Sequence, residues 1–147
     1  MENKIVYREV NSLNQVDAAY IAGLIDGEGT VTLSRRHRNE NRQLVISISN
    51  TERPLLEYVL NTVGAGKITG KKTYQTHHTA SYTYTASNRQ GLALLSQISP
   101  YLKTYKLKRA QLILRDYVRL TPRNGHYTAE IKIARIDFER EVLAIKP

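Results

Sequence analysis

The segment from Ala18 to Thr30 constrains the fold of this 147-residue chain more than any other. It reads Ala-Ala-Tyr-Ile-Ala-Gly-Leu-Ile-Asp-Gly-Glu-Gly-Thr, and Asn14 stands where a helix N-cap is expected. We therefore predict a helix from about Gln15 to Gly27. Its apolar stripe can pack onto the protein's own sheet, and it consists of Ile21, Leu24 and Ile25.

The opposite face of this predicted helix carries almost no side-chain bulk. Residues that share a face at helical spacing there are Ala19, Ala22, Gly23 and Asp26. Glycine inside a helix costs about 1 kcal/mol relative to alanine, so its presence indicates close approach of another backbone. The chain has one copy of this helix, and we predict a homodimer in which these four residues cross their counterparts at a two-fold axis.

The remaining periodicities predict two β-hairpins separated by helices. The hairpin strands are expected at 30–38 with 43–49 and at 67–69 with 81–85, and helices at 54–63, 89–96 and after Pro100. A last helix carries Ile131, Ile133, Ile136, Phe138 and Val142. This order predicts an α+β fold: a four-stranded antiparallel sheet with helices on one face, in a single domain spanning 1–147.

Strand alternation divides the hairpins into two faces. The face expected to contact the helices holds Val31, Leu33, Leu44, Ile46, Ile48, Tyr82 and Tyr84. Its opposite is rich in hydroxyl, amide and basic side chains: Thr32, Ser34, Arg36, Arg38, Gln43, Ser47, Ser49, Lys67, Thr69, Lys71, Ser81 and Thr83. Such residues reach base edges and phosphates, and the DNA major groove admits a two-stranded ribbon. We predict that this face binds double-stranded DNA; the alternative is an ordinary solvated face.

Charge and composition narrow the class of protein. The net charge is +9 with no cysteine, which favours a polyanionic partner and excludes disulfides and cysteine-ligated zinc. The chain has no apolar run of membrane-span length, and its N-terminus lacks the pattern of a signal peptide. We expect a soluble intracellular protein without a membrane or small-molecule partner, in an organelle (chloroplast or mitochondrion) or a prokaryotic cytoplasm.

Two acids flanked by glycines, Asp26 and Glu28, close the first helix. Carboxylates are disfavoured at the negative end of the helix dipole, and a divalent cation with a preference for oxygen ligands would offset that cost. In a dimer of crossed helices, two Glu28 carboxylates would meet at the axis. This predicts a paired-metal site for phosphodiester hydrolysis. The alternative is a glycine-rich turn with solvated acids.

The segment Ile21-Ala-Gly-Leu-Ile-Asp-Gly-Glu-Gly29 resembles the signature of the LAGLIDADG homing endonuclease family. It differs from that signature at Ile21, Gly27 and Glu28, where the family pattern has Leu, Ala and Asp. The predicted order of elements also resembles the family's αββαββα core. The resemblance covers about 14–119, and the C-terminal helical tail of about 120–147 lies outside it.

The resemblance implies a saddle-shaped sheet in the major groove and a set of site residues. By this likeness Glu28 is the metal-binding carboxylate and the Gly27 carbonyl a second ligand, for Mg²⁺ or Mn²⁺. Asn50 stands at the end of the second strand, where the family places a polar residue. A basic residue of the long helix after the second hairpin completes the catalytic set; Lys108 fits best, with Lys106 as the competitor.

One copy of the motif implies a homodimer on a pseudo-palindromic DNA target. A strand of about ten residues spans roughly 33 Å, or about ten base pairs, so two protomers would cover roughly twenty. The function that the resemblance implies is a metal-dependent double-strand break that serves intron homing. The alternatives are an RNA-binding intron maturase, a non-catalytic DNA-binding regulator on the same fold, and a structural dimerisation domain.

Overall fold

The computed structural model describes residues 8–70 and 79–147 and has the predicted order of helices and strands. The elements are α1 (Gln15–Glu28), β1 (Gly29–Ser34), β2 (Gln43–Asn50), α2 (Arg53–Val63), β3 (Lys67–Gly70), β4 (Tyr82–Ser87), α3 (Asn88–Ile98), the 3-10 turn η1 (Ser99–Tyr101), α4 (Lys106–Asp116) and α5 (Ala129–Ala144). Two strand ends differ from the prediction by two residues or more. The strand β1 ends at Ser34, so Arg36 and Arg38 lie in the β1–β2 loop, and β4 continues to Ser87.

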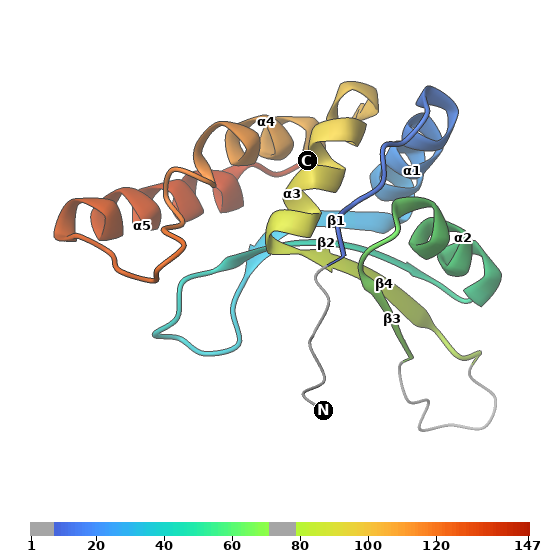
Figure 1. Ribbon diagram of the computed structural model, residues 1–147, viewed down its shortest axis with the longest axis horizontal. Coiled ribbons are helices and arrows are strands. Elements are labelled where there is room, and N and C mark those ends of the chain that lie inside the picture. Colours follow the sequence, from blue (N-terminus) through green and yellow to red (C-terminus); the bar gives the residue numbers. More distant parts are fainter. Residues whose placement is uncertain (1–7, 71–78) are drawn as a thin grey trace.

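The strands form one antiparallel sheet in the order β1-β2-β4-β3, so the two hairpins join through β2 and β4. All the helices lie on one side of this sheet, as predicted, and the other side is open (Figure 1). The sheet is arched in this view, because the β1–β2 loop at one end and β3 at the other lie lower than its middle. Its open face is therefore concave, in agreement with the saddle-shaped sheet that the sequence predicts.

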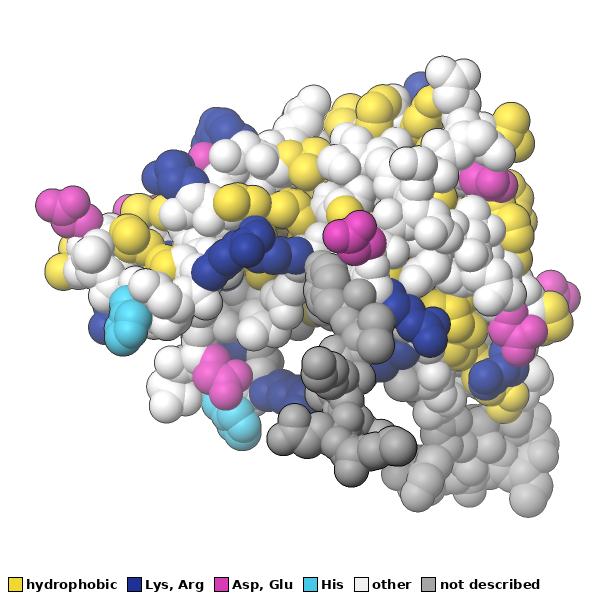
Figure 2. All heavy atoms as spheres, in the orientation of Figure 1, with side chains coloured by type: hydrophobic (Ala, Val, Ile, Leu, Met, Phe, Trp, Pro, Cys, Tyr) yellow, Lys and Arg dark blue, Asp and Glu magenta, His cyan; other side chains and the backbone are white. Residues whose placement is uncertain are grey.

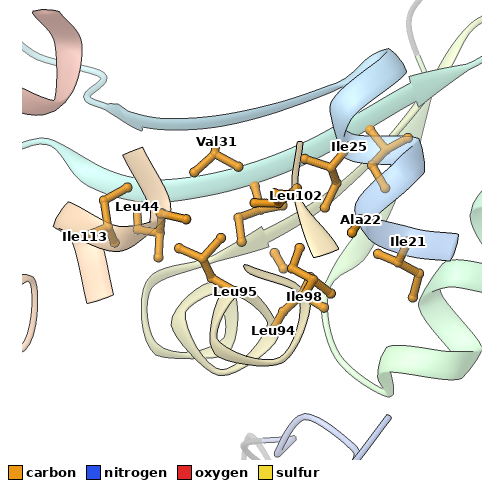
Figure 3. Close-up of a cluster of buried hydrophobic side chains, with 14 of the residues drawn as sticks. Ile21, Ala22, Ile25, Val31, Leu44, Leu94, Leu95, Ile98, Leu102 and Ile113 are labelled. Atoms are coloured by element: carbon orange, nitrogen blue, oxygen red, sulfur yellow. The ribbon is translucent and has the colours of Figure 1, made fainter. Parts of the chain in front are cut away.

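The core lies between the arched sheet and the helices, and strand alternation determines which side chains enter it. Val31, Leu44 and Ile46 are fully or almost fully buried, whereas Thr32 and Val45 on the other face remain accessible. Figure 3 shows side chains of α1, α3 and α4 meeting those of the strands in this layer. Because successive side chains of a strand point to opposite faces of the sheet, each strand position belongs either to the core or to the open face.

The helix ends follow local sequence rules. The Asn14 side chain accepts a hydrogen bond from the Asp17 backbone at 2.8 Å and caps α1, as predicted. Helix α2 has Pro54 in its first turn and ends at Gly64, whose φ of 79° is in the left-handed region that glycine tolerates. Nowhere in 8–70 or 79–147 does a helix combine the length and apolarity needed to cross a membrane.

The buried side of α5 does not coincide with its apolar residues. Phe138 and Val142 are buried, but Ile133 and Ile136 are exposed. Arg135 and Glu139 occupy the buried positions instead. Hydrophobicity alone is misleading here, because an arginine and a glutamate four residues apart satisfy each other's charge on the inner side of the helix.

We predict that Ile46→Ala lowers the free energy of unfolding by about 2–4 kcal/mol, because it removes fully buried methyl groups from the central strand. The matched control is Val45→Ala on the same strand, which changes the open face and should cost less than about 1 kcal/mol. Urea denaturation at equal protein concentration measures both. Equal losses would show that the two faces of β2 are wrongly assigned.

Candidate functional site

Helix α1 passes directly into strand β1, and Glu28 is the last residue of the helix. The transition depends on Gly29, because a Cβ atom there would lie 2.7 Å from the Ile25 Cα and 2.8 Å from the Ser47 carbonyl oxygen. Only glycine allows the helix end to lie this close to β2. The absence of a connecting loop fixes the Glu28 backbone between two regular elements.

Asn50 holds the carboxylate of Glu28. Its amide Nδ2 donates a hydrogen bond to Glu28 Oε2 at 2.6 Å, and its Oδ1 accepts one from the Glu52 backbone at 2.8 Å. The second bond determines which way the amide faces, since Oδ1 must point to Glu52 and Nδ2 is left for Glu28. The structure therefore brings together two of the three side chains predicted to be catalytic.

The third predicted side chain, Lys108, is replaced at this site by its competitor Lys106. The Lys106 ammonium donates to the carbonyl oxygens of Ile25 at 2.7 Å and Asp26 at 3.0 Å, at the negative end of α1. Lys108 is exposed. Two residues along a helix is a rotation of about 200°, so the two lysines project to nearly opposite sides of α4. The structure thus assigns Lys106, rather than Lys108, to the end of α1.

The carboxylate of Asp26 is engaged by hydrogen bonds within its own chain. Its carboxylate accepts hydrogen bonds from the Lys103 backbone at 2.8 Å, the Thr104 backbone at 3.2 Å and the Thr104 hydroxyl. Partial burial works to raise the pKa of Asp26, but these hydrogen bonds together with the nearby Lys106 charge outweigh it and lower the pKa. Asp26 and Lys106 thus tie the end of α1 to α4 and to the two residues that lead into it, one as acceptor and the other as donor.

The exposed face of α1 is rotated about the helix axis relative to the predicted dimer face, and the two share only some residues. Ala22 has no exposed surface, because it packs inside the core (Figure 3), so it is unavailable to a second copy. Ala19 and Gly23 are exposed as predicted. The accessible stripe continues through Val16 (78% exposed), Tyr20 (49%) and Gly27. A Cβ at Gly23 or Gly27 would meet nothing within 4 Å, so packing within the described protomer does not require either glycine.

Among the described residues, the carboxylate of Glu28 belongs to no larger cluster of common metal-ligating side chains. Within 8–70 and 79–147, no group of three or more His, Cys, Asp or Glu residues is placed to hold a metal ion. The oxygen atoms at this junction are those of the Glu28 carboxylate and of the backbone at the end of α1.

The open face of the sheet carries the polar residues that alternation predicts. Thr32, Ser47, Ser49, Ser81 and Thr83 are partly accessible there, and Ser34, Gln43, Lys67 and Thr69 are exposed. Arg36 and Arg38 are exposed in the β1–β2 loop, and Lys71 lies outside the described residues. Figure 2 shows Lys and Arg side chains along the lower side of the molecule, where Figure 1 places the sheet and this loop.

A cleft of about 530 Å³ on this face extends from the β1–β2 loop to β3. Besides predicted residues such as Gln43 and Lys67, it is lined by six residues outside the predicted DNA-binding set: Arg35, Glu40, Asn41, Val45, Thr85 and Ser87. Thr85 and Ser87 continue the alternation of β4 to its actual end, so a longer strand assignment would have included them.

The model of the LAGLIDADG endonuclease family matches residues 21–120, about two thirds of the chain. The chain belongs to this family. The match begins within α1 and extends past α4, so it contains Glu28, Asn50 and Lys106, while α5 lies beyond it.

Solved structures of homing endonucleases share the fold. The homing endonuclease I-CvuI, determined in complex with its target, has a TM-score of 0.72 at 16% identity, over 90% of this chain and 83% of its own. The archaeal intron-encoded I-Vdi141I, complexed with DNA, has a TM-score of 0.65 at 21% identity, over 90% and 85%. I-GzeII, bound to a DNA target, has a TM-score of 0.65 at 16% identity, but this chain covers only 45% of its length.

We predict that Lys106→Met lowers the free energy of unfolding by about 1–2 kcal/mol at pH 7, because two carbonyl oxygens lose a charged donor. The control Lys108→Met should change it by less than about 0.5 kcal/mol.

Burial lowers the pKa of Lys106 from its ordinary 10.5, so the unfolded chain keeps this proton to higher pH. Wild type should therefore gain stability relative to Lys106→Met as pH rises toward 10.5. Chemical denaturation across pH measures this, and equal losses in both variants would contradict the assignment of Lys106.

Proposed function

We propose that this protein is a site-specific DNA endonuclease that acts as a homodimer and makes a double-strand break in a long pseudo-palindromic target. The observation that carries the proposal is the placement of Glu28. Its carboxylate stands at the junction of α1 and β1, held by Asn50 at 2.6 Å, beside a concave polar sheet face. Family membership and the likeness to DNA-bound homing endonucleases support the same reaction class.

The donor atoms at this junction suit a hard divalent cation, Mg²⁺ or Mn²⁺. Asn50 binds one carboxylate oxygen of Glu28, so the other can ligate a cation, and oxygen atoms are the ligands that Mg²⁺ prefers. The carbonyl of Gly27 is the proposed second ligand. When bound, the cation lowers the pKa of water and offsets the negative charge that develops at the phosphate.

The side chains around Glu28 orient the reacting groups. Asn50 fixes the rotamer of Glu28 through the bond that Glu52 directs. Lys106 neutralises the negative end of α1 and keeps a positive charge near the scissile phosphate. We therefore propose Glu28, Asn50 and Lys106 as the catalytic set of each protomer.

The exposed stripe of α1 supports the homodimer. Glycine in a helix costs about 1 kcal/mol at each position, and packing within the described protomer does not explain Gly23 or Gly27. Close packing of a second α1 on this stripe would also bury Val16 and Tyr20, which are accessible in one copy. Such a dimer brings two Glu28 carboxylates toward one axis, one for each DNA strand.

The open face sets the expected length of the target. The eight residues of β2 span about 26 Å, or roughly eight base pairs, and the β1–β2 loop extends this reach. Two protomers would therefore cover on the order of twenty base pairs. A cleavage site of this length is rare in a genome, which is consistent with a role in intron homing.

We predict that Glu28→Gln abolishes cleavage while DNA binding in Ca²⁺ or EDTA stays within about three-fold of wild type, since the change removes one charge and keeps the shape. The measurement uses a randomised pseudo-palindromic library with Mg²⁺ or EDTA, followed by sequencing of the cut ends. The matched control is Glu141→Gln, an exposed carboxylate on α5 that should cut like wild type.

The outcomes separate the candidate functions. Metal-dependent cuts at a two-fold-related consensus, lost in Glu28→Gln, support the endonuclease. Sequence-selective retention without cutting by wild type would indicate a regulator. Absence of any selected DNA would indicate an RNA-binding maturase, and unaltered cutting by Glu28→Gln would remove Glu28 from the site.

We also predict that Gly23→Leu converts the dimer to a monomer by blocking the approach of the two helices, with dissociation constants at least about 100-fold weaker. A Cβ at Gly23 would meet nothing within 4 Å in the protomer, so the variant should stay folded as a monomer, with a helical circular dichroism spectrum like that of wild type. Gln111→Leu on the exposed side of α4 adds the same bulk elsewhere and serves as control. Sedimentation equilibrium measures both, and a stable Gly23→Leu dimer would exclude this interface.

A further inference from the structure

Helix α5 holds both backbone polar groups of Arg42, the residue that joins the β1–β2 loop to β2. The Arg135 guanidinium donates a hydrogen bond from Nη2 to the Arg42 carbonyl oxygen. The Glu139 carboxylate accepts from the Arg42 backbone N–H at 2.7 Å. Resting on the function proposed above, we propose that Arg135 and Glu139, the α5 clamp, position the β1–β2 loop and thereby determine recognition of the outer base pairs of each half-site.

The clamp is buried and itself well supported. Arg135 is 1% exposed, and its Nη1 donates to the Leu120 carbonyl at 2.9 Å and to the Thr121 hydroxyl. Its guanidinium carbon lies 4.9 Å from the centre of the Tyr117 ring, and Glu139 Oε2 lies 3.5 Å from its Nε. Its buried Nε makes no hydrogen bond with the described residues, but the charge cannot move without losing those of its two terminal nitrogens, so it is a rigid reference for the loop.

A third anchor lies two residues further along the chain. The Tyr117 hydroxyl accepts from the Leu44 backbone N–H at 3.1 Å and donates to Asn88 Oδ1 at 2.9 Å. The β2–β4 ladder begins only at Val45, opposite Ser87, so backbone groups before it need other partners. Side chains of α4 and α5 supply these partners at the base of the loop.

The position of the clamp points to recognition rather than to the cleavage chemistry. The six residues of β1 separate Glu28 from the loop by about 20 Å. The loop carries Arg35 and Arg36, which line the open-face cleft, and Arg38. Through the Arg42 backbone, the clamp sets the register at which these side chains meet DNA. It therefore acts on base pairs far from the scissile bonds.

A purely structural role for α5 gives a different expectation. Phe138 and Val142 also bury α5 against the rest of the protein. If α5 contributes only to stability, a core variant and a clamp variant of equal stability should have the same target profile. A loss of stability alone does not change how well the protein discriminates between base pairs at the outer positions of its DNA target.

The test compares Glu139→Ala, Glu139→Gln and Val142→Ala with wild type on the cleavage library. Glu139→Ala removes the acceptor for the Arg42 N–H, Glu139→Gln keeps an oxygen there, and Val142→Ala is the stability control. We expect Glu139→Ala to lose about ten-fold in discrimination at the outer base pairs of each half-site, with inner positions unchanged. The KM should rise while kcat at saturating DNA stays near wild type, and Glu139→Gln should restore most of the selectivity.

A second measurement needs no DNA. Hydrogen exchange should show that the Arg42 amide and its neighbours in 35–42 lose protection in Glu139→Ala but keep it in Val142→Ala. An unchanged target profile and unchanged protection of 35–42 in Glu139→Ala would overturn the clamp alone. Equal loss of discrimination at all positions, or in Val142→Ala as well, would also overturn it. Selection of no DNA site by wild type would overturn both the clamp and the endonuclease.

Discussion

The structure depends on the close contact between the end of α1 and strand β2 at Gly29. Because no Cβ intervenes, the chain changes from helix to strand without a loop, and the helix end lies against the Ser47 carbonyl. The same short stretch therefore belongs to the helical layer and to the sheet. Glu28 is the residue at which these two parts meet, so movement of either part moves its carboxylate.

The helical layer completes the sheet as well as covering it. Apolar contacts bury the inner face, but the ends of strands leave backbone donors and acceptors without ladder partners. Polar side chains bind such groups: Tyr117 and Arg135 bind the backbone of Leu44 and Arg42, just before the β2–β4 ladder. At the other end of β1, Lys106 binds two carbonyl oxygens in the last turn of α1. Side chains from the helical layer thus hold the chain at both ends of β1.

The sequence predicts the two faces of the sheet well because side chains alternate along a strand, so each residue can face only one of two sides. Every predicted inner residue of β1 and β2 is buried, and the fold class is confirmed. The pairing of Glu28 with Asn50 also follows from the motif, although their separation of 22 positions gives no local signal.

The differences between the predicted and observed placements have a common physical cause, which is dependence on contacts distant in sequence. Ala22 faces the core because of where α3 packs, and no property of alanine indicates this. The choice between Lys106 and Lys108 depends on the start of α4 and on carbonyls about eighty residues away. Arg135 is a charged residue that composition assigns to solvent, yet its partners Arg42 and Glu139 make burial favourable.

The alternation of the strands has a consequence for how such a protein can change over generations. Core residues such as Ile46 and Ile48 and open-face residues such as Ser47 and Ser49 are neighbours in sequence but face separate environments. Substitutions on the open face leave the packed interior intact, so they accumulate at little cost in folding. A lineage with this architecture can acquire a new binding preference by single steps, while the helices and the Glu28–Asn50 pair are inherited unchanged.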